Sequence, residues 1–119
     1  MKALKAFAVL FVAGLVAGCP SNVIPQSFSE RVAAAYTGIA LTNDTATILV
    51  NAGAVSKAHG RDVLERTREA RELTDIASSL HSEDRLGTAL ELLQAAKEYL
   101  CRDRENEPNC QYLLAQETP

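Results

Sequence analysis

The side chains with the clearest potential for chemistry are three cysteines and two histidines. Cys101 and Cys110 enclose the charged segment RDRENEPN. Such a pair could bind a metal, exchange electrons or form a structural disulfide. Its spacing is much longer than the C-x2-C pattern of zinc sites and the C-x-x-C pattern of redox pairs, which disfavours the first two. The choice also depends on Cys19 and on the compartment in which the protein resides.

The histidines and their polar neighbours do not form a catalytic pattern. His59 and His81 flank a predicted helix at opposite ends, so they cannot share a metal within one molecule, and we expect both to be surface residues. His81, Ser82 and Asp84 are triad residue types, but neighbours at a helix start do not point at one another as a nucleophile and a base must. The sequence also has no glycine-rich phosphate loop. We expect a protein that is not an enzyme and that binds no metal and no cofactor.

The first 20 residues have the layout of an export signal. The segment MKALK carries two lysines and no acid, and an uncharged apolar run follows over residues 6–18. Cys19 and Pro20 interrupt this run before it reaches the about 20 residues that a membrane-spanning helix needs. The letters LVAGC, residues 15–19, resemble the lipobox of bacterial lipoproteins.

This resemblance implies a lipid anchor. In that family the signal peptide is removed before the cysteine, here between Gly18 and Cys19, and the cysteine carries a diacylglyceryl thioether and usually an acylated amino terminus. Two or three acyl chains hold a protein on a membrane almost permanently. Pro20 stands where an aspartate would favour the inner membrane, so the resemblance implies the outer membrane, facing the periplasm. Val16 replaces the usual leucine; the alternative is a secretory signal cleaved near Ala17 that leaves a free thiol.

Export decides between the three roles of the remaining cysteines. With Cys19 consumed by lipid, Cys101 and Cys110 form an even pair in an oxidising compartment, where disulfides persist. We therefore predict a disulfide between them, whose loop of about ten residues should stabilise the fold by about 2.5 kcal/mol.

The loss of the signal peptide makes the chain more acidic. The full sequence has 12 basic and 15 acidic residues; without Lys2 and Lys5 it has 10 basic residues and a formal charge of −5. Such a surface repels nucleic-acid phosphates. We expect no nucleic-acid partner.

The rest of the sequence predicts an all-α fold, an up-down-up three-helix bundle. We expect an acylated tether over residues 19–26, the bundle over residues 27–105 and a disulfide-tethered tail over residues 106–119, whose order is left open. Ser27, Ser56 and Ser82 are the predicted helix caps, and the helices should run from 28 to 51, from 57 to about 80, and from 83 to between 102 and 105. Thr42 to Thr45 is the weakest part of the first helix and a candidate kink, either a solvent-facing turn with one buried threonine or a polar site.

Apolar residues at helical spacing give each helix a predicted buried face. In the first helix these are Phe28, Val32, Ala35, Tyr36, Ile39, Ala46 and Val50; in the second, Val63, Thr67, Ala70, Leu73, Ile76, Ala77 and Leu80; in the third, Leu86, Ala89, Leu90, Leu93, Ala96 and Leu100. The other face of the second helix is charged and should be exposed, with pairs such as Arg61 with Glu65 and Asp62 with Arg66.

These features predict a structural or interaction module of the cell envelope. If the first helix leaves the membrane, the disulfide loop lies at the distal end, where an envelope protein partner could bind. The length, layout and alanine-rich helices also resemble small helical lipoproteins of tailed phages and prophages. That resemblance implies two alternatives, an outer-membrane spanin-type lysis lipoprotein or a superinfection-exclusion factor. A carrier of a small ligand is a further alternative, for which the predicted core offers little room.

Overall fold

The computed structural model describes residues 27–116, so the predictions for the signal peptide, Gly18, Cys19 and the tether lie outside the described residues. Within this range the chain forms four helices and no strand, which confirms the predicted all-α class. The helices are α2 (Phe28–Asn51), α3 (Lys57–Leu80), α4 (Glu83–Cys101) and α5 (Pro108–Ala115).

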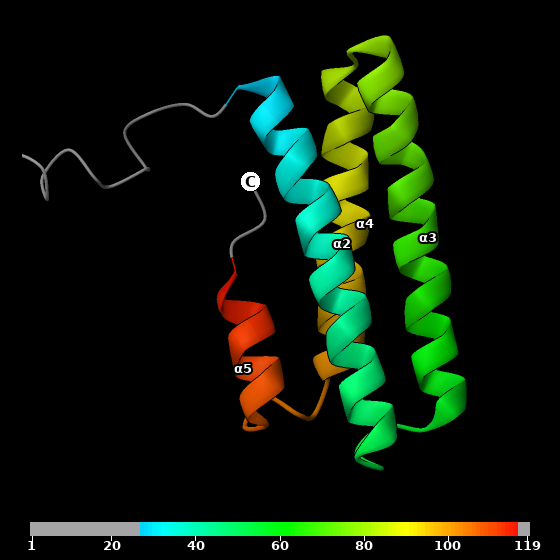
Figure 1. Cartoon of the computed structure of the whole chain (residues 1–119), viewed down its shortest axis with the longest axis vertical. Helices are drawn as coiled ribbons and strands as arrows, with labels where there is room; N and C mark the ends of the chain where they lie inside the picture. Colours follow the sequence, from blue (N-terminus) through cyan, green and yellow to red (C-terminus); the bar gives the residue numbers. More distant parts are fainter. Residues whose placement is uncertain (1–26, 117–119) are drawn as a thin grey trace, which may run out of the picture.

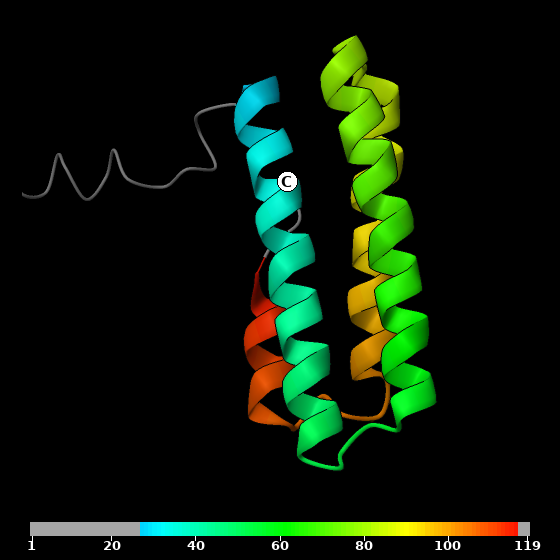
Figure 2. The same ribbon diagram turned by 45° about the vertical axis from the view of Figure 1, so that its right-hand side comes forward.

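The three long helices lie side by side, and successive helices run in alternating directions along the long axis (Figure 1). The turned view shows the short α5 next to α2, with α3 and α4 on the other side (Figure 2); α5 packs against both α2 and α4. We call the end with the α2–α3 turn, the last turn of α4 and the first turn of α5 the disulfide end. The opposite end, with the first turn of α2 and the α3–α4 turn, is the Phe28 end.

Serine side chains start each of the three long helices, as predicted. The hydroxyls of Ser27, Ser56 and Ser82 accept hydrogen bonds from backbone N–H groups three residues later, at 3.2, 3.0 and 3.3 Å. Each hydroxyl thereby satisfies one of the donors that a helix start leaves without a partner. The predicted starts at residues 28, 57 and 83 are confirmed.

The segment predicted as a tail contains α5. Glu107 is the cap of this helix, because its carboxylate accepts from the Cys110 N–H at 3.1 Å. Pro108 takes the first helical position, where a missing N–H costs nothing. Leu113 is fully buried, so this part of the predicted tail is ordered and packs against the bundle. α4 ends at Cys101, one residue before the predicted range.

The core consists of three clusters spaced along the bundle. The largest lies at the disulfide end and contains Ala46, Leu49, Val55, Val63, Leu100, Cys101, Cys110 and Leu113. The cluster at the Phe28 end contains Val32, Ala35, Ala77, Leu86 and Leu90, and a small one between them contains Ile39, Ala70 and Leu93. All six residues predicted for the buried face of α4 are buried.

The predicted buried face of α3 is partly wrong. Ile76 and Leu80 are 40% and 62% exposed. The residues of α3 that are buried are Gly60, Val63, Thr67, Ala70, Thr74 and Ala77, which follow one another at spacings of three and four. Ile76 precedes Ala77 by one residue and is therefore turned about 100° away from this stripe. Small side chains, rather than the largest apolar ones, face the core.

The predicted weak part of the first helix is neither a kink nor a solvent-facing turn. α2 is unbroken, and Thr42 and Thr45 are both buried. Their hydroxyls donate to the carbonyls of Gly38 and Leu41, four residues earlier, at 2.7 and 2.8 Å. Each hydroxyl thus finds its partner within its own helix, which allows it to be buried without a costly unpaired group.

Candidate functional site

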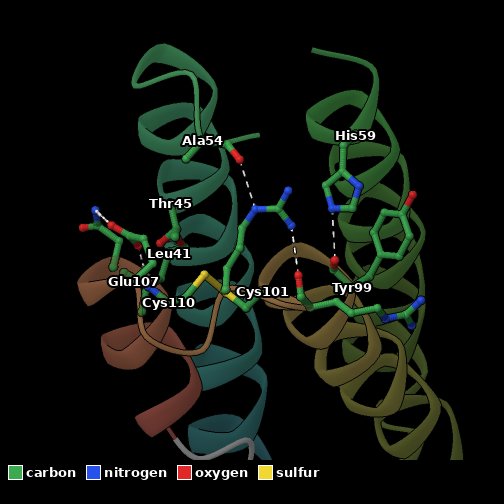
Figure 3. The surroundings of a disulfide bond; sticks show 11 residues. Leu41, Thr45, Ala54, His59, Tyr99, Cys101, Glu107 and Cys110 are labelled. Atoms are coloured by element: carbon green, nitrogen blue, oxygen red, sulfur yellow. Dashed lines mark hydrogen bonds between the residues drawn. A yellow bond between two sulfur atoms is a disulfide. The ribbon is translucent and has the colours of Figure 1, made fainter. Parts of the chain in front are cut away.

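The disulfide joins the last residue of α4 to the first turn of α5. Cys101 and Cys110 are bonded with their Cα atoms 5.6 Å apart, within the usual range for a disulfide. They are only 1% and 0% exposed, and they lie between the helix ends (Figure 3). Thiol exchange requires access to a sulfur atom. The burial of both cysteines therefore favours a structural bond over a redox centre.

Arg104 connects the loop after the disulfide to the α2–α3 turn. Its Nε donates to the carbonyl of Ala54 at 3.1 Å, and a terminal nitrogen donates to the carbonyl of Arg102 at 2.9 Å (Figure 3). Asp103, just before it, has a φ of 63°, in the left-handed region. This bend of the backbone leads the chain away from α4 and toward α5. Three segments that are distant in sequence meet at this end.

Tyr99 organises the charged side chains around the last turn of α4. The guanidinium of Arg66 lies 4.2 Å from the centre of its ring, and that of Arg102 lies 5.8 Å away. Both distances fit cation–π contacts. The Tyr99 hydroxyl donates to Asp62 at 3.2 Å. The predicted exposed face of α3 is confirmed, but Asp62 and Arg66 meet Tyr99 rather than forming the predicted ion pair with each other.

His59 is part of this cluster and not the plain surface residue that we predicted. Its ring stacks on Tyr99 with centroids 4.3 Å apart, and the side chain is half-buried. Its Nε2 lies 3.0 Å from the carbonyl oxygen of Tyr99 (Figure 3). A carbonyl can only accept, so Nε2 carries the proton and satisfies one of the carbonyls that the end of α4 leaves open. His81, in contrast, is exposed, and its ring contacts Phe28.

A groove between α2 and α3 opens at the disulfide end. It has a volume of about 460 Å³ and is lined by Ala46, Thr47, Val50, Asn51, Lys57, Gly60, Arg61 and Leu64. A Cβ atom on Gly60 would lie 2.6 Å from Cγ2 of Val50, so the glycine allows the two helices to approach closely. We call this feature the α2–α3 groove.

A second, polar hollow lies farther along the same two helices. Tyr36 donates a hydrogen bond to Asp75 across the helices, and Thr67 donates to Asn43 at 2.6 Å. The hydrogen bond to Asp75 raises the pKa of Tyr36 above its ordinary value, with smaller contributions from burial and from the charge of Asp75. These bonds cross between α2 and α3 and fix one helix against the other.

A buried lysine lies between α4 and the end of α5. Lys97 is 2% exposed, and its Nζ donates to the carbonyl oxygen of Gln116 at 3.2 Å. Burial lowers the pKa of Lys97 from its ordinary value, because the charged form loses its hydration. No pattern in the sequence singled out this lysine.

The described part of the chain, residues 27–116, offers neither a membrane-spanning helix nor a cluster of metal ligands. No helix in this range is both long and apolar enough to span a bilayer, and no three or more histidine, cysteine or acidic side chains gather there as metal ligands would. The predicted site residues thus divide into two sets. Cys101 and Cys110 meet at the disulfide end, whereas Gly18 and Cys19 lie outside the described residues.

Comparisons with known proteins give no relative for this chain. No protein-family model, no curated protein and no solved structure matches it.

Proposed function

We propose that this protein is a non-enzymatic lipoprotein of the bacterial envelope that holds a contact surface away from the membrane. Its anchor is an acylated Cys19, as the LVAGC motif implies. The membrane is the outer membrane, and the protein faces the periplasm. The disulfide end is the surface that meets a protein partner.

The observation that supports this proposal is the placement of the two ends of α2. The predicted tether joins the bundle at Ser27, and the disulfide lies at the far end of α2 (Figure 1). A helix of 24 residues spans about 36 Å. If α2 points away from the membrane, an anchor before Ser27 leaves the disulfide end, with its groove and its Tyr99 cluster, farthest from the bilayer.

The anchor is tested with Cys19→Ser in the full chain. We expect this variant to lose membrane attachment or to accumulate as an uncleaved precursor, and only the unsubstituted chain should incorporate radiolabelled fatty acid. Density-gradient separation of the membranes then distinguishes the outer from the inner membrane. The control is the double variant Cys101→Ser/Cys110→Ser, which keeps the anchor. Normal maturation and membrane fractionation of Cys19→Ser would overturn the proposal.

The contact role is tested with a photo-cross-linking residue placed at each end of the bundle in turn. At the disulfide end the position is Ala54, in the α2–α3 turn, and at the Phe28 end it is Asp84, in the first turn of α4; both are exposed. We expect an adduct with an envelope protein from Ala54 and none from Asp84. Equal adducts from both positions, or none from either, would contradict a distal contact surface.

A further inference from the structure

We infer that the α2–α3 groove docks an acidic amphipathic helix of a partner protein. The inference deepens the proposed function, and it rests on that proposal only for the compartment in which the partner is met. Its own basis is the shape, the lining and the charges of the groove.

The shape of the groove suits a helix better than a small molecule. Its floor is apolar, formed by Ala46, Val50 and the backbone at Gly60. Its two edges are open to water, since all five remaining lining residues are exposed: Thr47, Asn51, Lys57, Arg61 and Leu64. A small-molecule site usually encloses most of its ligand. An open apolar groove between two helices instead matches the helix-in-groove mode, in which one face of a helix is buried.

Leu64 is the main apolar contact that the groove offers to such a helix. Its side chain is 45% exposed at the edge of the groove, although it is a large apolar residue on a helix that is otherwise mostly charged outside the core. A partner that covers Leu64 and Val50 would remove this apolar surface from water. The helix that does so needs apolar residues three or four apart, matching one face of an α-helix.

The charges of the groove favour an acidic partner. Lys57 and Arg61 are one helical turn apart on the same side of the groove, and no acid among residues 27–116 lines it. Neither cation forms an ion pair or a side-chain hydrogen bond within the described residues. The nearest acids along α3 are engaged elsewhere, because Asp62 accepts from Tyr99 and Glu65 pairs with Arg68. Carboxylates of the partner would form ion pairs with these two cations.

The floor of the groove is held in place before any partner binds. Val50 packs against the core cluster that contains the disulfide, and Ala46 belongs to that cluster. The surface therefore needs little rearrangement, which lowers the entropic cost of binding.

The first experiment is photo-cross-linking in cells that make the full chain. A photoreactive residue at Thr47, at the edge of the groove, should give an adduct, and one at Glu91, an exposed residue of α4, should not. Mass spectrometry of the adduct should identify a segment with acidic residues beside apolar residues spaced by three or four. A second copy of this chain, an adduct of lipid mass, a basic segment, or the absence of an adduct specific to Thr47 would each overturn the inference.

The second experiment measures how the cross-linked segment, synthesised as a peptide, binds to the purified full chain. Leu64→Ala should weaken binding about tenfold, whereas Ile76→Ala, a similarly exposed apolar residue outside the groove, should leave it unchanged. Arg61→Glu should weaken it about fivefold, whereas Arg85→Glu, on α4, should have little effect. All four substitutions are at exposed positions, so the fold is retained. Equal effects within either pair would overturn the inference.

The outcomes separate this inference from the proposed function. If Cys19→Ser remains on the membrane but groove-specific adducts persist, the lipoprotein proposal fails and the groove stands. If the lipid anchor is demonstrated but the peptide binds Leu64→Ala as well as the unsubstituted chain, the docking inference fails and the lipoprotein proposal stands.

Discussion

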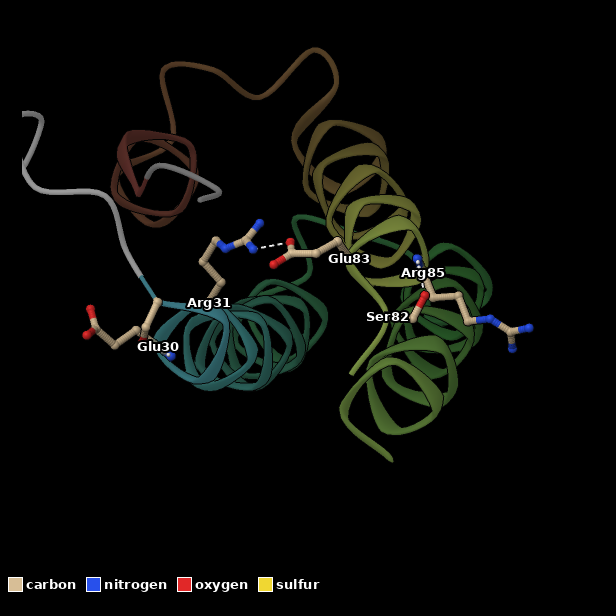
Figure 4. Close-up of polar contacts among 6 residues, drawn as sticks. Glu30, Arg31, Ser82, Glu83 and Arg85 are labelled. Atoms are coloured by element: carbon tan, nitrogen blue, oxygen red, sulfur yellow. Dashed lines mark hydrogen bonds and ion pairs between the residues drawn. The ribbon is translucent and has the colours of Figure 1, made fainter. Parts of the chain in front are cut away.

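At the disulfide end, α4 and α5 are joined covalently and Arg104 reaches the backbone of Ala54 in the α2–α3 turn, whereas the Phe28 end has no covalent link within the described residues. There Arg31 pairs with Glu83 between α2 and α4 (Figure 4), and the Phe28 ring lies 4.1 Å from that of His81. The core clusters differ as well, with eight buried residues at the disulfide end and five at the Phe28 end.

This difference matters for where the bundle opens first. Regions with few buried contacts and exposed polar contacts open at a lower free energy than the rest of a protein. We therefore expect amide hydrogen exchange to be fastest in the first turn of α2 and slowest in the last turn of α4. Such a gradient would agree with the proposed anchor at one end and the proposed contact surface at the other.

Truncation of one core leucine at each end gives the largest expected effect. Leu100 and Leu86 are both fully buried. Each substitution to alanine should cost about 2–5 kcal/mol in free energy of unfolding, depending on how far the cavity can collapse. Because the disulfide limits collapse around Leu100, Leu100→Ala should cost more than Leu86→Ala. Chemical denaturation measures both; an equal or larger loss for Leu86→Ala would break the comparison.

Removal of the disulfide should have the next largest effect. Cys101→Ser/Cys110→Ser should lower the free energy of unfolding by about 2.5 kcal/mol, because the unfolded chain regains the freedom of the open loop. Hydrogen exchange should accelerate most in α5 and least in the first turn of α2. A reducing agent should reproduce the loss in the unsubstituted protein and leave the double variant unchanged. A denaturation midpoint that does not move would count against a stabilising role.

Two glycine substitutions should change stability in opposite directions. A Cβ at Gly60 would meet Cγ2 of Val50, whose β-branched side chain has little freedom to move. Gly60→Ala should therefore cost about 1 kcal/mol, as overpacking outweighs the gain in helix propensity. A Cβ at Gly87, near the start of α4, would have no atom of the described residues within 4 Å apart from those of its own stretch of helix. Gly87→Ala should raise stability by about 0.5–1 kcal/mol. Thermal unfolding measures both; stabilisation by Gly60→Ala would contradict the close approach.

Features that depend on a few neighbouring residues could be predicted from the sequence. Each serine cap acts on a backbone N–H three residues away, so Ser27, Ser56 and Ser82 indicated the helix starts. The buried face of α4 was equally clear, because leucines and alanines repeat along it at helical spacing.

Features that depend on how the helices meet could not be predicted in this way. A proline disfavours helical geometry in the residue before it, yet Pro108, which follows the cap residue Glu107, begins a helix here. The rotation of α3 that exposes Ile76 follows from the close packing of its small residues, which apolar periodicity does not weigh. The α2–α3 groove had one signal in the sequence, a glycine inside a helical segment with Lys57 and Arg61 close by. That Val50 lies opposite this glycine depends on the tertiary packing of the two helices.

One arginine at each end gives the last pair of substitutions, and Arg31→Gln has the smallest expected effect of all. Arg31→Gln should cost at most about 0.5 kcal/mol, because its pair with Glu83 is partly exposed, with side chains 26% and 57% accessible. Arg104→Gln should cost about 1 kcal/mol, since it removes hydrogen bonds to two backbone carbonyls. Salt separates the two: because the Debye length falls to about 3 Å at about 1 M ionic strength, the cost of Arg31→Gln should shrink, while most of the cost of Arg104→Gln should remain. If both costs shrink equally with salt, the loop after the disulfide is held no more firmly than the Phe28 end, and the proposed contact surface would depend on the disulfide alone.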